Sequence, residues 1–296
     1  MTTDASRTSA PGGDMARLAV PGLIWGTSFY FIAEGLKAFP AAAITPLRVA
    51  FGFATLAFVP AARLRLPRSA WPRLVLLGAV WMAIPLTMFP FAEERVASSV
   101  AGMLNGAIPL FVATVATVVY KRRPSRAQLY GLAVGFVGVV LIAAPTLGEG
   151  SSSVVGIALI FVALACYGFA LDLAAPLQQA HGSLPVLWNA QLVALVLVLP
   201  LGVPTFGDIE FAWKPFLMIG ALGVFGTALA YVVMAANAGR FGSTRASVTT
   251  YLIPVVSLAL GAVILDETVE LLSVLGCAVT LWGAYLAGRP AAQRQH

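Results

Sequence analysis

Few side chains in this sequence could perform catalysis. Both histidines, His181 and His296, fall in a loop or in the C-terminal tail, and no two carboxylates stand at helical spacing within an apolar segment. The glycine-rich loop with which P-loop proteins bind phosphate is also missing. We therefore expect a protein that is not an enzyme and that has no cofactor and no metal site.

One enzymatic alternative is a membrane-embedded transferase. Such an enzyme would use clusters of acidic side chains to hold a metal ion and a diphosphate. The chain has two acidic clusters, Glu93-Glu94 and Asp266-Glu267, but both fall at the ends of apolar segments. Their position disfavours a transferase.

Asn105 is a candidate for binding a small molecule. Its polar side chain stands in the middle of an apolar segment, where polar groups are costly and therefore informative. Gly102 and Gly106 flank it and would let a ligand or another backbone approach closely. Asn105 either lines a cavity as a donor and acceptor or makes a hydrogen bond between helices. The sequence leaves both interpretations open.

Two charged side chains also fall within apolar segments. Arg48 is the only basic one, and we expect it either to extend toward the membrane surface or to pair with Glu34. Transporters of phosphates or nucleotide sugars should carry several buried cations, so a single arginine argues against anionic substrates. Asp172 is the best-placed carboxylate and is a candidate for coupling to protons.

The composition requires a membrane environment for these residues. The 296 residues are 59% hydrophobic and only 10% charged, whereas a soluble domain carries about 25% charged residues. The net charge of +6 is spread over short loops, which does not fit a nucleic-acid-binding face. A membrane helix needs roughly 20 apolar residues. By that rule the sequence predicts ten spans, at 18–36, 41–62, 74–92, 96–120, 128–144, 154–173, 185–203, 216–236, 244–265 and 271–287.

The basic residues predict the orientation of these spans. Lys and Arg are enriched on the cytoplasmic side of membrane proteins. With the amino terminus inside, the outer loops hold only Lys37, Arg95 and Lys214, and nearly all other basic residues fall inside. We therefore expect a multi-pass protein with both termini cytoplasmic, including a disordered tail at 1–16 and a second tail at 289–296.

The two halves of the chain repeat each other. At one constant offset Pro109 falls on Pro254, Gly131 on Gly276 and Gly138 on Gly283. The predicted repeats are 17–146 and 153–288, each with five helices. Because five is odd, the second repeat must cross the membrane in the opposite sense, and inverted repeats are typical of alternating-access transporters with a site near the midplane.

The repeated residues also suggest structural roles. The glycines of the fifth and tenth spans favour close helix packing, which we expect within one chain. Pro109 and Pro254 each remove a backbone donor, so they could act as matched hinges as the cavity opens to either side. A fixed bend needed for packing is the alternative.

Several motifs resemble the drug/metabolite transporter superfamily, in its ten-helix EamA-type branch. They are Ile24-Trp25-Gly26-Thr27-Ser28-Phe29, then Thr45-Pro46-Leu47-Arg48, and Asp266-Glu267 after the ninth span. Within this branch the chain is similar to the YddG-type amino-acid exporters. The resemblance covers nearly the whole chain after Met15. One departure is the basic stretch Lys121-Arg122-Arg123, where many family members carry an acidic residue.

The resemblance implies an all-α integral membrane protein of the bacterial inner membrane, with ten helices around a central cavity. It implies a monomer in the lipid bilayer that exports neutral or zwitterionic metabolites, mainly aromatic and other neutral amino acids, by alternating access. Drugs or other metabolites are the alternative substrates. On the helices that it places around the cavity, the candidate binding residues are Trp25, Phe29, Trp81, Phe89, Asn105, Tyr167, Tyr231 and Tyr251. For any single aromatic residue, contact with lipid is the alternative.

Overall fold

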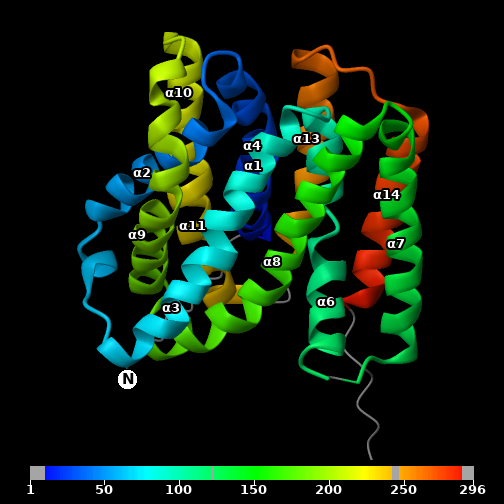
Figure 1. The fold of residues 1–296 in the computed structure, drawn as a ribbon. Helices are drawn as coiled ribbons and strands as arrows, with labels where there is room; N and C mark the ends of the chain where they lie inside the picture. Colours follow the sequence, from blue (N-terminus) through cyan, green and yellow to red (C-terminus); the bar gives the residue numbers. More distant parts are fainter. Residues whose placement is uncertain (1–10, 122, 242–246, 289–296) are drawn as a thin grey trace, which may run out of the picture.

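All regular elements in the described part of the chain are helices (Figure 1). The computed structural model describes residues 11–121, 123–241 and 247–288. The α-helices are α1 (Pro11–Leu36), α2 (Ala41–Ala57), α3 (Trp71–Gly78), α4 (Ile84–Glu93), α5 (Ser98–Asn105), α6 (Ile108–Val118), α7 (Arg126–Leu147), α8 (Ser151–His181), α9 (Ser183–Gly202), α10 (Trp213–Ala221), α11 (Ala230–Phe241), α13 (Leu252–Ile264) and α14 (Leu271–Ala287).

Shorter helical elements connect or continue these helices. Two of them are π-helical, η3 (Ala79–Ala83) between α3 and α4 and η5 (Leu222–Leu229) between α10 and α11. The others are 3-10 helices, namely η1 (Pro60–Arg63), η2 (Arg68–Ala70), η4 (Val203–Asp208) and η6 (Ser247–Tyr251).

Length and composition identify membrane spans among these elements. Five continuous helical segments are long and apolar enough to cross a bilayer, and the bent pair α5–α6 adds a sixth. The five are Arg68–Glu93, Arg126–Leu147, Ser151–His181, Ser183–Asp208 and Trp213–Asn237. Shorter apolar helices cover Ala41–Ala57, Thr249–Ile264 and Leu271–Ala287. The chain is therefore an all-helical protein that crosses the membrane several times.

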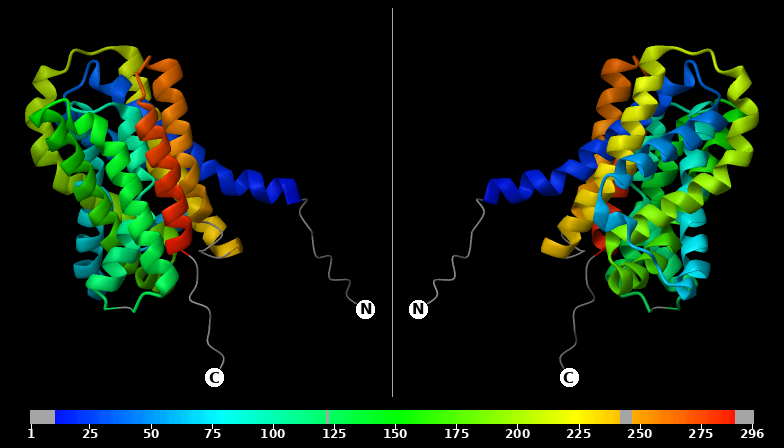
Figure 2. Two further views of the ribbon diagram at one scale, coloured as in Figure 1. Left: turned by 90° about the vertical axis from the view of Figure 1, so that its right-hand side faces the viewer. Right: turned by 90° about the vertical axis from the view of Figure 1, so that its left-hand side faces the viewer.

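Some helix boundaries differ from the predicted spans for identifiable reasons. Helix α1 begins at Pro11, a residue suited to the first turn of a helix, so residues 11–16 are helical although we expected them in the tail. These first turns stand away from the bundle (Figure 2). Helix α2 ends at Ala57, short of the predicted residue 62, because Val59 precedes Pro60 and is extended. The tails at 1–10 and 289–296 lie outside the described residues.

The predicted fourth span is bent rather than straight. Helices α5 and α6 meet at a break of two residues, Gly106 and Ala107, with an angle of 44° between them. Pro109 lies in the first turn of α6 and has no N–H to continue the helix of α5. Pro254 has a similar place in the first turn of α13, directly after the 3-10 turn η6.

Glycines bring α7 and α14 into backbone contact, side by side at the right of Figure 1. A Cβ atom on Gly283 would collide with the backbone of Gly135, and one on Gly138 would collide with the backbone nitrogen of Thr280. The hydroxyl of Ser273 on α14 donates to the carbonyl of Ile142 on α7 at 3.0 Å. The predicted close packing within one chain is thus confirmed for these two helices.

We predict that Gly283→Ala destabilises the protein, because two backbones must separate to admit a methyl group. Overpacking of this kind costs about 1–3 kcal/mol of unfolding free energy. The matched control is Gly220→Ala on α10, where the nearest atoms to a new Cβ are Phe51 side-chain carbons at 3.9 Å. Thermal unfolding in detergent should show a lower midpoint for Gly283→Ala only. Equal midpoints for the two variants would contradict the packing described.

Candidate functional site

One cavity of about 440 Å³ lies among the helices. It falls in the volume range of small-molecule sites. The residues that we predicted for binding all line it, although they come from seven separate elements. They are Trp25, Phe29, Trp81, Phe89, Asn105, Tyr167, Tyr231 and Tyr251.

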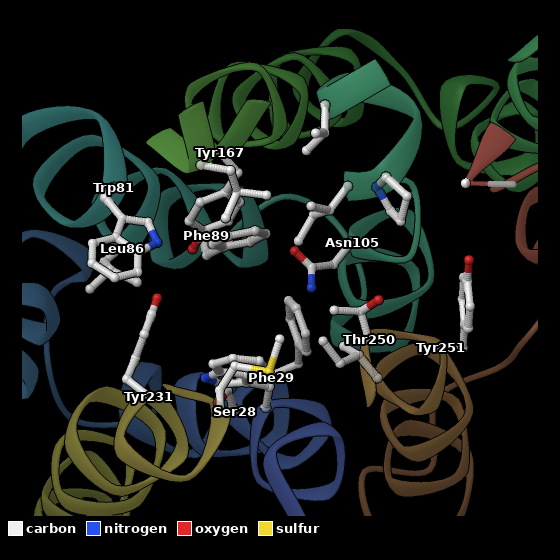
Figure 3. Close-up of a pocket in the computed structure, with 18 of the residues that line it drawn as sticks. Ser28, Phe29, Trp81, Leu86, Phe89, Asn105, Tyr167, Tyr231, Thr250 and Tyr251 are labelled. Carbon is white, nitrogen blue, oxygen red and sulfur yellow. The ribbon is translucent and has the colours of Figure 1, made fainter. Parts of the chain in front are cut away.

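Aromatic rings form most of the central wall (Figure 3). Tyr231 makes edge-to-face contacts with Trp25 and Trp81, with ring centroids 5.2 Å and 5.1 Å apart. Phe89 contacts Phe29 in the same manner, at 5.4 Å, and lies 6.4 Å from Tyr167. Such pairs hold the rings in fixed orientations. The cavity therefore offers preformed apolar surfaces to a ligand.

Irregular helix geometry helps to present these side chains. Trp81 lies in the π-helical turn η3, and Tyr231 follows the π-helical turn η5. The indole Nε1 of Trp25 donates to the carbonyl of Gly226 in η5, at 3.1 Å. π-helical turns are rare and often occur at functional sites, because the extra residue redirects side chains and frees backbone carbonyls.

Asn105 ends α5 at the break before α6, and its amide points into the cavity (Figure 3). The residue is 6% exposed, and among the described residues no donor reaches its buried Oδ1 atom. Of the two interpretations left open by the sequence, the structure favours the cavity-lining one. A buried amide oxygen without a partner can accept a hydrogen bond from a ligand.

The position of α5 depends on Glu267, which follows α13 in sequence. Its Oε1 accepts hydrogen bonds from the backbone N–H and the hydroxyl of Ser98, both at 2.8 Å, and its Oε2 accepts one from the N–H of Ser99 at 2.9 Å. The first N–H groups of a helix have no partner within it, so a carboxylate stabilises this end through hydrogen bonds and charge. Gly261 leaves room for the carboxylate, since a Cβ there would collide with it.

The cavity extends toward the lower end of the bundle in Figure 1. Its lining includes Gln128 near the start of α7 and Ala287 and Gly288 at the end of α14. On α1 and α4, both of which continue to the upper end, the last lining residues are Ile32 and Phe89. Glu267 and the first turn of α5 lie at that upper end. The cavity lining therefore reaches the lower ends of α7 and α14 and stops about one turn before the upper ends of α1 and α4.

Arg48 lines the cavity, which corrects our expectation for this residue. It is 4% exposed, and its Nε donates to the hydroxyl of Thr227 at 2.8 Å. It does not pair with Glu34, whose carboxylate contacts Lys37 at 2.6 Å and Lys214 at 2.8 Å instead. Glu34 has closer cations at the upper end. The sequence signal for Arg48 as a site residue is its position within a predicted span, where charged side chains are rare and usually functional.

Two acidic residues on the helices, Asp172 and Glu93, do not line the cavity. Asp172 lies on α8 but is not part of the cavity lining, so the structure does not join it to the predicted binding residues. Glu93 ends α4, and both of its carboxylate oxygens are buried and accept no hydrogen bond from the described residues. In the sequence, Glu93 stands only at the end of an apolar segment, which gives no sign of this burial.

The two prolines predicted as hinges take different places relative to the cavity. Pro109 lines the cavity, whereas Pro254 does not and packs its ring near Gly106. Within residues 11–121, 123–241 and 247–288, no three His, Cys, Asp or Glu side chains come close enough together to hold a metal ion.

Comparisons with known proteins show which proteins this chain resembles. The sequence pattern of the EamA-like transporter family matches residues 16–144 and again residues 154–289. An uncharacterized transporter of Archaeoglobus fulgidus is 24% identical, over 92% of this chain and 97% of its own length. A probable amino-acid metabolite efflux pump of Salmonella typhimurium is 27% identical, over 94% of this chain and 95% of its own length.

A known crystal structure has a similar fold. Its TM-score is 0.63 at 18% sequence identity, and the match covers 90% of this chain and 97% of that one. At this identity the similarity concerns the fold alone.

We predict that Glu267→Gln lowers thermal stability, because a neutral amide replaces a carboxylate that accepts three hydrogen bonds. The loss should be about 1–2 kcal/mol of unfolding free energy, as for other helix caps. Glu270→Gln is the matched control, since Glu270 is exposed and makes no side-chain cap to α14. Midpoints measured in detergent should separate the two variants, and an unchanged Glu267→Gln midpoint would show that the cap is dispensable.

Proposed function

The chain belongs to the EamA-like transporter family, and we propose that it exports small neutral or zwitterionic metabolites, mainly aromatic and other neutral amino acids, by alternating access. The observation that carries the proposal is the aromatic cavity with a few polar groups. Rings at Trp25, Trp81 and Tyr231 suit an apolar or aromatic side chain, and Asn105 offers an acceptor. A similar protein of Salmonella typhimurium is named a probable amino-acid metabolite efflux pump.

Symmetry in the contacts of α7 and α14 supports two inverted five-helix repeats, and hence ten membrane crossings. Gly131 approaches the backbone nitrogen of Ala287, and its repeat partner Gly276 approaches the backbone nitrogen of Ile142. At the offset that aligns the halves, Ala287 falls on Ile142. The first contact is therefore the second one with the two halves exchanged.

A second pair of contacts behaves in the same manner. Gly138 approaches the backbone nitrogen of Thr280, and Gly283 approaches that of Gly135. At the same offset Gly138 aligns with Gly283, and the partner Gly135 aligns with the partner Thr280. Two antiparallel helices related by an axis in the membrane plane would produce this pattern, which is the arrangement typical of inverted-repeat transporters.

The bent elements could provide the motion for alternating access. Pro109 and Pro254 each lie in the first turn after an irregular segment, so each marks a point where the backbone is not held by continuous helical hydrogen bonds. We retain them as the proposed hinges. Asp172 remains a proposed coupling residue, although it lies outside the cavity.

The proposed orientation puts the lower end of Figure 1 in the cytoplasm of a bacterial cell. The segment just before α3, which contains Arg68, and the connection between α6 and α7, which contains Lys121, lie at that end. The connection between α13 and α14, which contains Asp266 and Glu267, lies at the other. Lys and Arg favour the cytoplasmic side. In this orientation the cavity is directed to the cytoplasm, the side from which an exporter takes its substrate. A monomer in the inner membrane is sufficient, because one chain encloses the cavity.

Drugs or other metabolites are the alternative substrates, and the apolar wall of the cavity would accept them. A transferase remains the disfavoured reading. Proteoliposome flux with a panel of radiolabelled amino acids, with and without an imposed pH gradient, separates these possibilities.

We predict that Asn105→Leu slows this flux by about 3- to 10-fold at low substrate concentration, the effect of one lost hydrogen bond. Asn189→Leu is the matched control, because Asn189 is a buried asparagine on α9 that donates to the carbonyl of Pro185 and does not line the cavity. Both variants should insert into membranes normally. Equal flux through both variants would remove Asn105 from the binding site.

A further inference from the structure

Arg48 carries a charge into the centre of the protein. It lies on α2, is 4% exposed and forms part of the cavity wall. A guanidinium keeps its proton in proteins. Burying a charge costs several kcal/mol unless an opposite charge and hydrogen bonds compensate for it. The partners of this side chain therefore indicate what the cavity is built to receive.

No carboxylate in the described part of the chain forms an ion pair with Arg48. Among the described residues, no acidic side chain lies within ion-pairing distance of its guanidinium. Glu34 is occupied by two lysines. The two carboxylate oxygens of Glu93 are buried and accept no hydrogen bond from Arg48 or from any other described residue. Arg48 therefore has no directly bonded counter-ion among the described residues.

The hydrogen bonds that do exist orient the guanidinium. Its Nε–H donates to Thr227 Oγ1 at 2.8 Å, and this hydroxyl donates in turn to the carbonyl of Leu222. Gln191 donates to the carbonyl of Thr227 and so holds the same π-helical turn. Of the five N–H groups of the guanidinium, only the Nε–H donates to an acceptor among the described residues. The others remain for a ligand.

The missing side chain of Gly226 leaves space beside the guanidinium of Arg48. Gly226 lies next to Arg48, and a Cβ there would stand 3.7 Å from Nη2 of Arg48 and 3.1 Å from Oγ of Ser28. Ser28 also lines the cavity. A Cβ at position 226 would therefore be in van der Waals contact with the end of the guanidinium.

We propose that Arg48 binds the carboxylate of the transported molecule through two parallel hydrogen bonds, so that the substrates are amino acids or other small organic carboxylates rather than amines or uncharged compounds. The two-pronged geometry of arginine matches a carboxylate. The aromatic rings then receive the substrate side chain, and Oδ1 of Asn105 accepts from its ammonium group. This inference rests on the proposed transport function and narrows its substrate class. It also revises the expectation from the sequence that a single buried cation disfavours anionic groups, since one arginine suffices for one carboxylate.

The test compares tryptophan with two analogues, tryptophan amide and indole-3-propionate. The first lacks the carboxylate and the second lacks only the ammonium group. Uptake of labelled tryptophan into proteoliposomes with the wild-type chain should be inhibited by indole-3-propionate and at least about 10-fold less by the amide, as expected for loss of a charge-assisted hydrogen bond. Equal inhibition by both analogues would overturn the proposal.

Variants locate the effect at Arg48. Arg48→Gln should raise the KM for tryptophan about 10- to 100-fold and abolish the preference for the carboxylate over the amide. Arg48→Lys keeps the charge but loses the planar fork, so it should retain part of the preference. Arg95→Gln is the matched control, because Arg95 pairs with Glu94 outside the cavity. An unchanged preference in Arg48→Lys and Arg48→Gln would contradict the proposal.

A binding measurement separates this inference from the transport proposal. Indole-3-propionate should raise the thermal midpoint of the detergent-purified wild type and not that of Arg48→Gln, whereas the amide should raise neither. That result without any flux would refute the transport function alone. Flux without a difference between the acid and the amide would refute the role of Arg48 alone.

If Glu93 is instead the functional counter-ion of Arg48, Glu93→Gln and Arg48→Gln should lower the thermal midpoint without changing the preference for the carboxylate over the amide. That result also overturns the proposal.

Discussion

The three hydrogen bonds from the first turn of α5 to Glu267 are the interaction on which the site depends. Helix α5 has only eight residues and ends at Asn105, in the wall of the cavity. A short helix has a large share of unpaired N–H groups, and within a bilayer water is not available to satisfy them. Glu267 comes from the segment after α13 and supplies the missing acceptors. It thereby connects the two halves of the chain at the upper end of the bundle in Figure 1.

The same constraint explains why the irregular parts of the backbone gather around the cavity. The break at Gly106 and Ala107 and the π-helical turns η3 and η5 all lie beside lining residues. Irregular backbone is tolerated at membrane depth where protein or a cavity, rather than lipid, surrounds it. By contrast, α7 and α14 are regular, line the cavity only at its lower end, and pack through glycines.

The sequence predicted the helical class and the family, and both are confirmed. The eight candidate binding residues line one cavity. They could be chosen from the sequence because family motifs and polar residues within apolar segments are strong signals. Their role in binding stays a prediction. The sequence could not predict the partners of Arg48 or Glu267. Thr227 and Ser98 are far from them along the chain, so each partner follows from how helices pack. Helix limits such as that of α2 depended on local proline effects that a hydropathy window averages out.

In alternating access, a cavity that opens to one side at a time carries the bound metabolite across the membrane. Counterflow distinguishes this mechanism from passive leakage. Proteoliposomes that contain the purified chain are loaded with unlabelled tryptophan and diluted into a trace of labelled tryptophan, and internal label is followed over time. Alternating access predicts that label rises transiently above its equilibrium level, because each outward trip with unlabelled substrate returns a site that can take up label. A steady approach to equilibrium without this overshoot would contradict alternating access.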